Sequence, residues 1–326
     1  MSSYDRRVII DSHVHLFARA QLPTLRWTPR LPSDHVLKGQ NSVQEYCSAI
    51  SSSAGKLRGF VFIESDRVSS LSHAGWNHAL EEVELPTRIA KWELREEEDE
   101  GFGAGDEDLV LGIVLWAPVP AGPEAMEAYM NSAKERCGDE KVLEKIKGVR
   151  YLVQDKPSGV MLQPRFIESL KWLRKQWAGF RFGCRCKEWR NLTAEGSLST
   201  SDLGGDCEWV ISPTPDGGTT FEEMARFDGT FMKLSGAFSE LLSSQNWQDP
   251  GSLERIIEIL TCDAFGPSRI MFGSDWPVCT VQWPWIELSW QYWHGVVEAI
   301  LSARNLSDDE STMIWSGTVQ AAYNIP

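Results

Sequence analysis

The chain has 326 residues, 42% of them hydrophobic, which is enough to bury a large core. Its formal net charge of −14 and pI near 5.0 argue against nucleic-acid binding and against attraction to an anionic membrane, because both need clustered Lys and Arg. Seven cysteines without a repeating pattern do not predict a disulfide framework, and neither a signal peptide nor a membrane-spanning run is visible. We therefore expect a cytoplasmic protein.

Short apolar runs alternate with longer amphipathic stretches, a pattern typical of parallel α/β proteins. In chain order, strands are predicted at residues 8–16, 59–64, 109–116, 146–153, 179–186, 207–212, 230–236 and 269–275. Helices are predicted at residues 40–51, 79–95, 123–137, 163–177, 252–261, 285–303 and 307–323. The acidic, glycine-rich residues 96–108 are expected to form a solvated loop.

Eight strands that alternate with helices predict an α/β fold of the (β/α)8 type, a TIM barrel. No internal repeat or interdomain linker is visible, so residues 1–326 are expected to form a single domain. In such a barrel the functional residues lie at the carboxyl ends of the strands. The polar residues at the ends of these apolar runs are His13, His15, Glu64, Arg150, Ser235 and Asp275.

His13 and His15 are two residues apart at the end of the first predicted strand. Residues i and i+2 of a strand point to the same side, so these imidazoles project together, as two metal ligands or two substrate contacts must. Asp275 ends the last predicted strand and becomes their neighbour only if the sheet closes or winds back on itself.

Four segments together resemble the amidohydrolase-related family, in particular its branch of sugar-lactone and dicarboxylate-lactone hydrolases. The segments are Asp11-Ser12-His13-Val14-His15, Gly148-Val149-Arg150, Met232-Lys233-Leu234-Ser235-Gly236 and Phe272-Gly273-Ser274-Asp275-Trp276-Pro277. The resemblance covers residues 8–180 and 228–326. It implies a distorted barrel of the metal-dependent hydrolase type that opens a small lactone, a cyclic ester, with activated water.

The resemblance also implies roles for the residues at the strand ends. His13, His15 and Asp275 would be the catalytic residues and would bind a divalent cation, with zinc as the leading candidate. A bound zinc ion brings the pKa of its water to about 7. Asp275 would then be the general base. A metal-independent mechanism, in which the same side chains handle water and substrate directly, is left open.

Three further residues are expected to bind substrate. Arg150 would clamp a carboxylate or carbonyl with its guanidinium fork, and a surface salt bridge is the alternative. Glu64 either takes part in this binding or serves as a structural partner for an Arg or Lys. Trp276 opens the tryptophan-rich residues 276–293, which predict a packed helix face, with an aromatic wall over a substrate pocket as the alternative.

The segment 180–228 departs from the family pattern, which calls for a strand five ending in Asp and usually a His at the end of strand six. No histidine occurs in this interval, so the region of strands five and six is atypical. It is either a genuine variant or the product of a shifted reading frame or mis-splicing, because codons for residues 181–191, read one base forward, can encode Asp-Leu-Gly-Val-Asp-Ala-Arg-Ser-Gly-Gly.

Two alternatives to lactone hydrolysis remain open. Related barrels with the same His-x-His pair and late aspartate are non-oxidative decarboxylases, and a catalytically impaired barrel could serve as a binding protein. In each enzymatic case the partner is a small-molecule substrate, with no nucleic acid and no membrane. Self-association into a homo-oligomer is left open.

Overall fold

The computed structural model describes residues 7–50, 57–91, 93–153, 155–157, 159–176, 181–185, 208–212, 225–226, 228–235, 265–281 and 288–326. Eight parallel strands form one sheet in the order β1 to β8, as predicted. Their bounds are β1 Ile9–Val14, β2 Leu57–Ile63, β3 Val110–Trp116, β4 Ile146–Arg150, β5 Arg181–Arg185, β6 Glu208–Ser212, β7 Thr230–Leu234 and β8 Ile270–Phe272. Each strand pairs with the next along the chain, which requires crossover connections.

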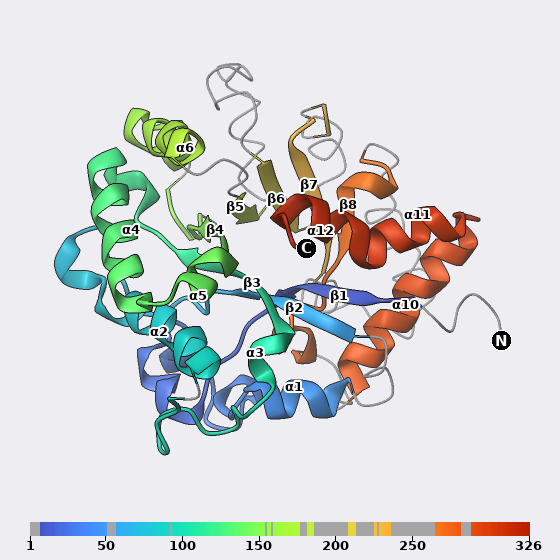
Figure 1. Ribbon diagram of the computed structural model, residues 1–326, viewed down its shortest axis with the longest axis horizontal. Coiled ribbons are helices and arrows are strands. Elements are labelled where there is room, and N and C mark those ends of the chain that lie inside the picture. The colour runs from blue at the N-terminus through green and yellow to red at the C-terminus, as the bar shows by residue number, and fades with distance from the viewer. Residues whose placement is uncertain are drawn as a thin grey trace.

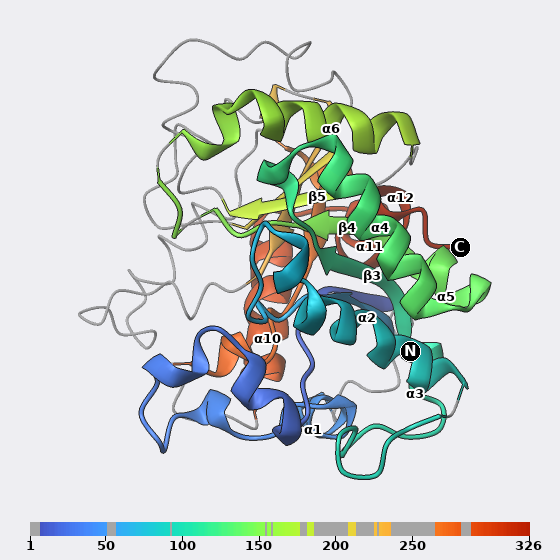
Figure 2. The ribbon, with the colours of Figure 1, turned by 90° about the vertical axis from the view of Figure 1, so that its left-hand side faces the viewer.

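Helices lie outside the strands (Figures 1 and 2), where they cover the apolar outer side of the sheet. The helices are α1 Val43–Ala49, α2 Asn77–Lys91, α3 Asp106–Leu109, α4 Pro123–Cys137, α5 Glu140–Lys145, α6 Pro164–Gln176, α10 Ser289–Ala303, α11 Asp308–Thr312 and α12 Thr318–Tyr323. Ser307 and Glu310 form a capping box at the start of the last helical segment. A short π-helix, Met313–Gly317, joins α11 to α12.

The apolar residues of β1 alternate between two buried clusters. Ile9 packs in the large cluster with Tyr46 and Trp290, whereas Ile10 packs in a smaller cluster with Met271 and Tyr323. The pairing of β1 with β2 is irregular between Asp11 and Val14. This alternation places the outer helices on one side of β1 and the inner side chains of the sheet on the other.

The carboxyl terminus lies at the amino ends of the strands. Arg58 in β2 donates a hydrogen bond to the backbone oxygen of Pro326, and Lys147 in β4 donates one to the backbone oxygen of Asn324. Since α12 and the residues after it occupy that end, the loops at the carboxyl ends of the strands are on the opposite side. Among the described helices, none has the length and hydropathy needed to cross a bilayer.

The expectation of a solvated loop at residues 96–108 is wrong in part. Asp99 is only 3% exposed because its carboxylate accepts two hydrogen bonds from the guanidinium of Arg88, and Phe102 is also buried. The end of the segment forms the start of α3. The acidic composition predicted that the segment would be exposed to solvent. The ion pair with Arg88 instead offsets the cost of burying the charge of Asp99.

Several predictions fall on residues outside the described part. The helix at 252–261, Trp283, Trp285 and the departure from the family pattern within 186–207 and 213–224 belong to this group. The two weaker strand predictions in the same region are confirmed as β5 and β6.

Candidate active site

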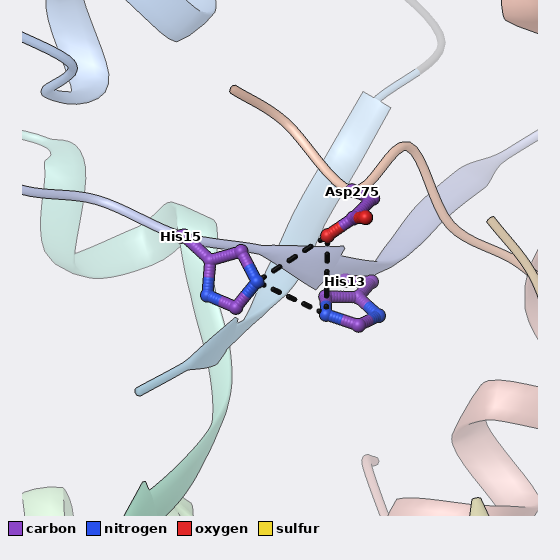
Figure 3. A group of neighbouring side chains, drawn as sticks. All are labelled: His13, His15 and Asp275. Carbon is purple, nitrogen blue, oxygen red and sulfur yellow. Dashed lines mark hydrogen bonds and ion pairs between the residues drawn. The ribbon is translucent and has the colours of Figure 1, made fainter. Parts of the chain in front are cut away.

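His13, His15 and Asp275 converge, as the sequence predicted (Figure 3). The Nε2 atoms of the two imidazoles lie 3.2 Å apart, and Oδ1 of Asp275 lies 3.4 Å from Nε2 of His13 and 3.3 Å from Nε2 of His15. All three side chains are buried. Two imidazole nitrogens and a carboxylate oxygen directed at one point form a donor set that fits a divalent cation.

The contacts of the Nδ1 atoms determine how the two imidazoles are oriented toward the candidate metal site. Nδ1 of His15 lies 3.0 Å from the backbone oxygen of Ile63 and 2.9 Å from that of Glu64. A carbonyl oxygen only accepts, so the proton of a neutral His15 belongs on Nδ1 and the lone pair of Nε2 is directed into the site. Nδ1 of His13 lies 3.5 Å from Oγ of Ser235, a hydroxyl that can either donate or accept.

Asp275 follows β8 and has a backbone φ of 58°, in the left-handed region that is uncommon for residues other than glycine. Hydrogen bonds on both sides fix this conformation. The backbone N–H of Asp275 donates to the oxygen of His13 at 2.9 Å, and the N–H of His15 donates to the oxygen of Trp276 at 2.8 Å. The residues after β8 are thereby held against the carboxyl end of β1, which orients the carboxylate toward the imidazoles.

Gly273 permits this close approach. A Cβ atom at this position would lie 2.9 Å from Oγ of Ser12, 3.0 Å from Cβ of His13 and 3.2 Å from Cβ of Ser235. These distances are shorter than ordinary van der Waals contacts, so any side chain here would push the end of β8 away from β1.

Asp11 is a residue to which sequence reasoning gave no role. Its Oδ1 accepts hydrogen bonds from the backbone N–H groups of His13 and Ser274, and its Oδ2 accepts from the hydroxyl of Tyr46 and from Nε1 of Trp290. Burial raises the pKa of this carboxyl, and the hydrogen bonds act in the opposite direction. The available signal was an acidic residue inside an apolar strand, which must find donors when it is buried.

Glu64 and Arg150 form a buried ion pair, with Nε of Arg150 2.6 Å from Oε1 of Glu64. Oε2 of Glu64 accepts the backbone N–H of Asp66 at 2.7 Å. Burial raises the pKa of Glu64, and the charge of Arg150 partly offsets this effect. The structural partnership that was one of the two interpretations of Glu64 is therefore present.

Lys233, in β7, is a second buried charge that sequence reasoning did not assign. Its Nζ donates to the backbone oxygen of Ser12 at 2.6 Å and lies 5.5 Å from the ring centre of Tyr323. Burial, with the repulsion of Arg150 next, lowers the pKa of Lys233 to about 7. A lysine in an otherwise apolar strand was the signal for this position.

The described tryptophans of residues 276–293 pack in the interior. Trp276 is 3% exposed and its ring lies edge-on to Tyr46 at 5.5 Å. Trp290 and Trp293 are buried and donate to Asp11 and to the backbone oxygen of Gly273. The predicted packed helix face is confirmed for these two residues, and a substrate contact by Trp276 stays a prediction.

Comparisons with known proteins agree with this arrangement. The family model described as amidohydrolase matches residues 217–318. The chain is 26% identical to L-rhamnono-gamma-lactonase of Scheffersomyces stipitis, with 100% of both chains covered. A 109-residue segment, 32% of this chain and 33% of the relative, is 34% identical to L-fucono-1,5-lactonase of Burkholderia multivorans. The chain is thus similar to amidohydrolases over its carboxyl-terminal third and to a sugar lactonase over its whole length.

The fold agrees with that of solved amidohydrolase structures. A Burkholderia multivorans amidohydrolase solved with bound zinc matches with a TM-score of 0.67 at 21% identity, covering 98% of this chain and 100% of that chain. A second crystal form of that protein matches with a TM-score of 0.68 at 20% identity, with the same coverage. The resemblance predicted from the sequence motifs is confirmed.

Proposed function

We propose that the chain is a lactone hydrolase that opens the cyclic ester of a small sugar lactone with activated water. The observation that carries this proposal is the convergence of His13, His15 and Asp275 after β1 and β8, in a chain similar over its whole length to a sugar lactonase. The positions of these residues at the carboxyl ends of the strands support the assignment, because that end carries catalysis in (β/α)8 enzymes.

The reaction needs a base, and Asp275 is the carboxylate in position to serve as one. Asp275 takes a proton from water as the water oxygen forms a bond to the lactone carbonyl carbon. Collapse of the tetrahedral intermediate breaks the bond between that carbon and the ring oxygen. The proton held by Asp275 passes to the departing alkoxide, which leaves a hydroxy acid as the single product.

His13 and His15 are the other two side chains of the reaction centre. Their Nε2 atoms, with Oδ1 of Asp275, are the atoms that would bind a divalent cation, and zinc suits this mixture of nitrogen and oxygen donors. When bound, such a cation supplies positive charge that lowers the pKa of water and polarises a carbonyl. The backbone oxygens of Ile63 and Glu64 fix the ring of His15, which keeps its Nε2 directed at the reacting atoms.

Arg150 is proposed to orient the lactone. The ion pair with Glu64 fixes the planar fork, and its terminal nitrogens are proposed to donate to a carbonyl or hydroxyl oxygen of the substrate. We further propose that the eight strands close into one distorted barrel over residues 1–326. The parallel bridge between Val14 and Trp276 supports this closure.

A lactone panel with metal analysis tests the proposed function. Ring opening releases a carboxylic acid, so titration at constant pH measures it directly, and elemental analysis of the purified protein measures bound metal. We expect base consumption with polyhydroxylated γ- or δ-lactones, and loss of activity on chelation that one equivalent of zinc restores. CO₂ release from an aromatic acid without ring opening of any lactone would favour the decarboxylase alternative instead.

A further inference from the structure

A cavity of about 90 Å³ opens beside the candidate site, at the carboxyl ends of β2, β3 and β4. Asp66 follows β2, Trp116 ends β3 and Tyr151 follows β4, and all three line the cavity. Arg26, Ser69 and Lys156 contribute to the same wall. The motifs that indicated the reaction centre include none of these residues.

Glu64 joins the cavity to the reaction centre. Its backbone oxygen accepts from Nδ1 of His15 at 2.9 Å, and its carboxylate contacts both Arg150 and the backbone N–H of Asp66. Trp116 pairs in register with Arg150, and Tyr151 is the next residue in the chain. Two residues of the cavity wall, Trp116 and Tyr151, are therefore neighbours of Arg150 in the sheet, so a lactone oriented by Arg150 lies close to the cavity.

The aromatic part of the wall is rigid. The ring of Trp116 packs against Tyr129 with centroids 5.4 Å apart, and the ring of Tyr151 packs against Phe166 at 6.4 Å. Rings supported from behind present a fixed apolar surface to the C–H groups of a ligand. The surface suits a ring compound that carries polar groups on its other side.

The charges of the wall are already balanced. Nε of Arg26 lies 3.3 Å from Oδ1 of Asp66, and Nζ of Lys156 lies 2.5 Å from Oδ1 of Asp155. A further substrate carboxylate would thus find each cation paired. The side chain of Asp66 is 21% exposed, and its Oδ2 accepts no hydrogen bond within the described residues, so this oxygen is available to a donor.

We propose that this cavity binds the hydroxyl-bearing part of the lactone and that Asp66 is a specificity-determining residue. Its carboxylate accepts hydrogen bonds from substrate hydroxyls and keeps Arg26 paired, so a second carboxylate finds no free cation and sugar lactones are selected over dicarboxylate lactones. The inference rests on the proposed lactone hydrolysis and assigns the part of the substrate that does not react.

The variant Asp66→Asn tests the role of this charge. Asparagine has the same size and tolerates the φ of 56° at this position, yet it lacks the negative charge. Kinetics are measured with a polyhydroxylated γ-lactone, with unsubstituted γ-butyrolactone and with a γ-lactone that carries a second carboxylate. We expect KM for the hydroxylated lactone to rise about 10-fold with kcat nearly unchanged, because a hydrogen bond to a charged acceptor is lost.

The other two substrates separate recognition from structural damage. KM for γ-butyrolactone should stay constant, and KM for the carboxylated lactone should fall because Arg26 loses its carboxylate partner. The variant Asp309→Asn, which removes a negative charge from the exposed surface of α11, should change none of the three values. An equal change for all three lactones in Asp66→Asn, or no change, would overturn the inference.

Calorimetry measures binding without turnover and so tests the role of Asp66 separately from the proposed reaction. In an Asp275→Asn background, in which turnover should be abolished, the hydroxylated lactone should bind about 10-fold more weakly once Asp66→Asn is added. Equal affinities of the single and double variants overturn the cavity assignment and leave lactone hydrolysis intact. A wild-type protein that opens no lactone, whatever it binds, overturns the proposed function instead.

Discussion

Oδ1 of Asp11 accepts the backbone N–H of Ser274 at 2.8 Å, a hydrogen bond that spans 263 residues of sequence. The same oxygen accepts the N–H of His13, so one carboxylate holds both chain segments of the candidate site. Asp11 lies on the side of β1 that faces Tyr46 and Trp290 and not on the side of the reacting atoms. We interpret it as a positioning residue.

Replacing Asp11 with Ala should cost about 3 kcal/mol or more in free energy of unfolding, because four donors lose their buried acceptor. Metal affinity should fall with it, since the backbones of His13 and Ser274 are no longer held together. The matched control is Tyr46→Phe, which removes one donor from Oδ2 and should cost about 1 kcal/mol with metal affinity retained. Urea unfolding and zinc titration measure both quantities; equal metal affinity in Asp11→Ala and wild type would refute the positioning role.

Gly273→Ala should weaken the site because it displaces the end of β8 from β1. The new methyl group would meet Ser12 and His13, so we expect a loss of about 1–3 kcal/mol in stability and a large loss of metal affinity. Gly295→Ala is the control, since Gly295 lies within α10 with open space around its Cβ position. That substitution should leave activity unchanged and add up to about 1 kcal/mol of stability through helix propensity. Thermal unfolding and metal titration of both variants decide whether close approach is required.

Because of Lys233, the stability of the protein should rise with pH between about pH 6 and about pH 9. Its folded-state pKa of about 7 lies below the ordinary 10.5, so above pH 7 the folded state has lost a proton that the unfolded state retains, and stability rises with pH. Relative to Lys233→Met, the wild type should gain roughly 3 kcal/mol between about pH 6 and about pH 9. Urea unfolding of both proteins at several pH values measures the difference. A constant difference would show that Lys233 does not titrate in this range.

Arg150 has a structural partner and a proposed substrate role, and a double variant separates the two. Arg150→Met leaves the carboxylate of Glu64 buried without its cation, which should cost about 3–5 kcal/mol in stability, and it should also raise KM. Adding Glu64→Gln removes the buried charge, so stability should recover while KM stays high. If KM recovers together with stability, Arg150 acts only through the fold.

The fold was predictable to a large extent because buried parallel strands appear in the sequence as short apolar runs. Even β5 and β6, in the region expected to be atypical, matched the predicted strands at 179–186 and 207–212. The convergence of His13, His15 and Asp275 also followed from strand-end positions and motif resemblance. Asp11 and Lys233 were missed because their functions depend on which distant groups surround them, and Asp99 because its partner Arg88 lies in another element.

The substrate cavity could not be read from the sequence for a similar reason. Asp66, Trp116 and Tyr151 come from three separate strand ends, and no spacing rule joins them. Their adjacency follows from the register between β3 and β4 and from the carboxylate of Glu64.

The central claim, that Asp275 activates water for lactone opening, is tested most directly by comparing Asp275→Asn with the wild type on the best lactone of the panel. Asparagine has the same shape but cannot accept the proton, so kcat should fall about 10³-fold or more. The dissociation constant of the lactone, measured by calorimetry, should change little. Retention of kcat within about 10-fold in a folded variant would contradict the account.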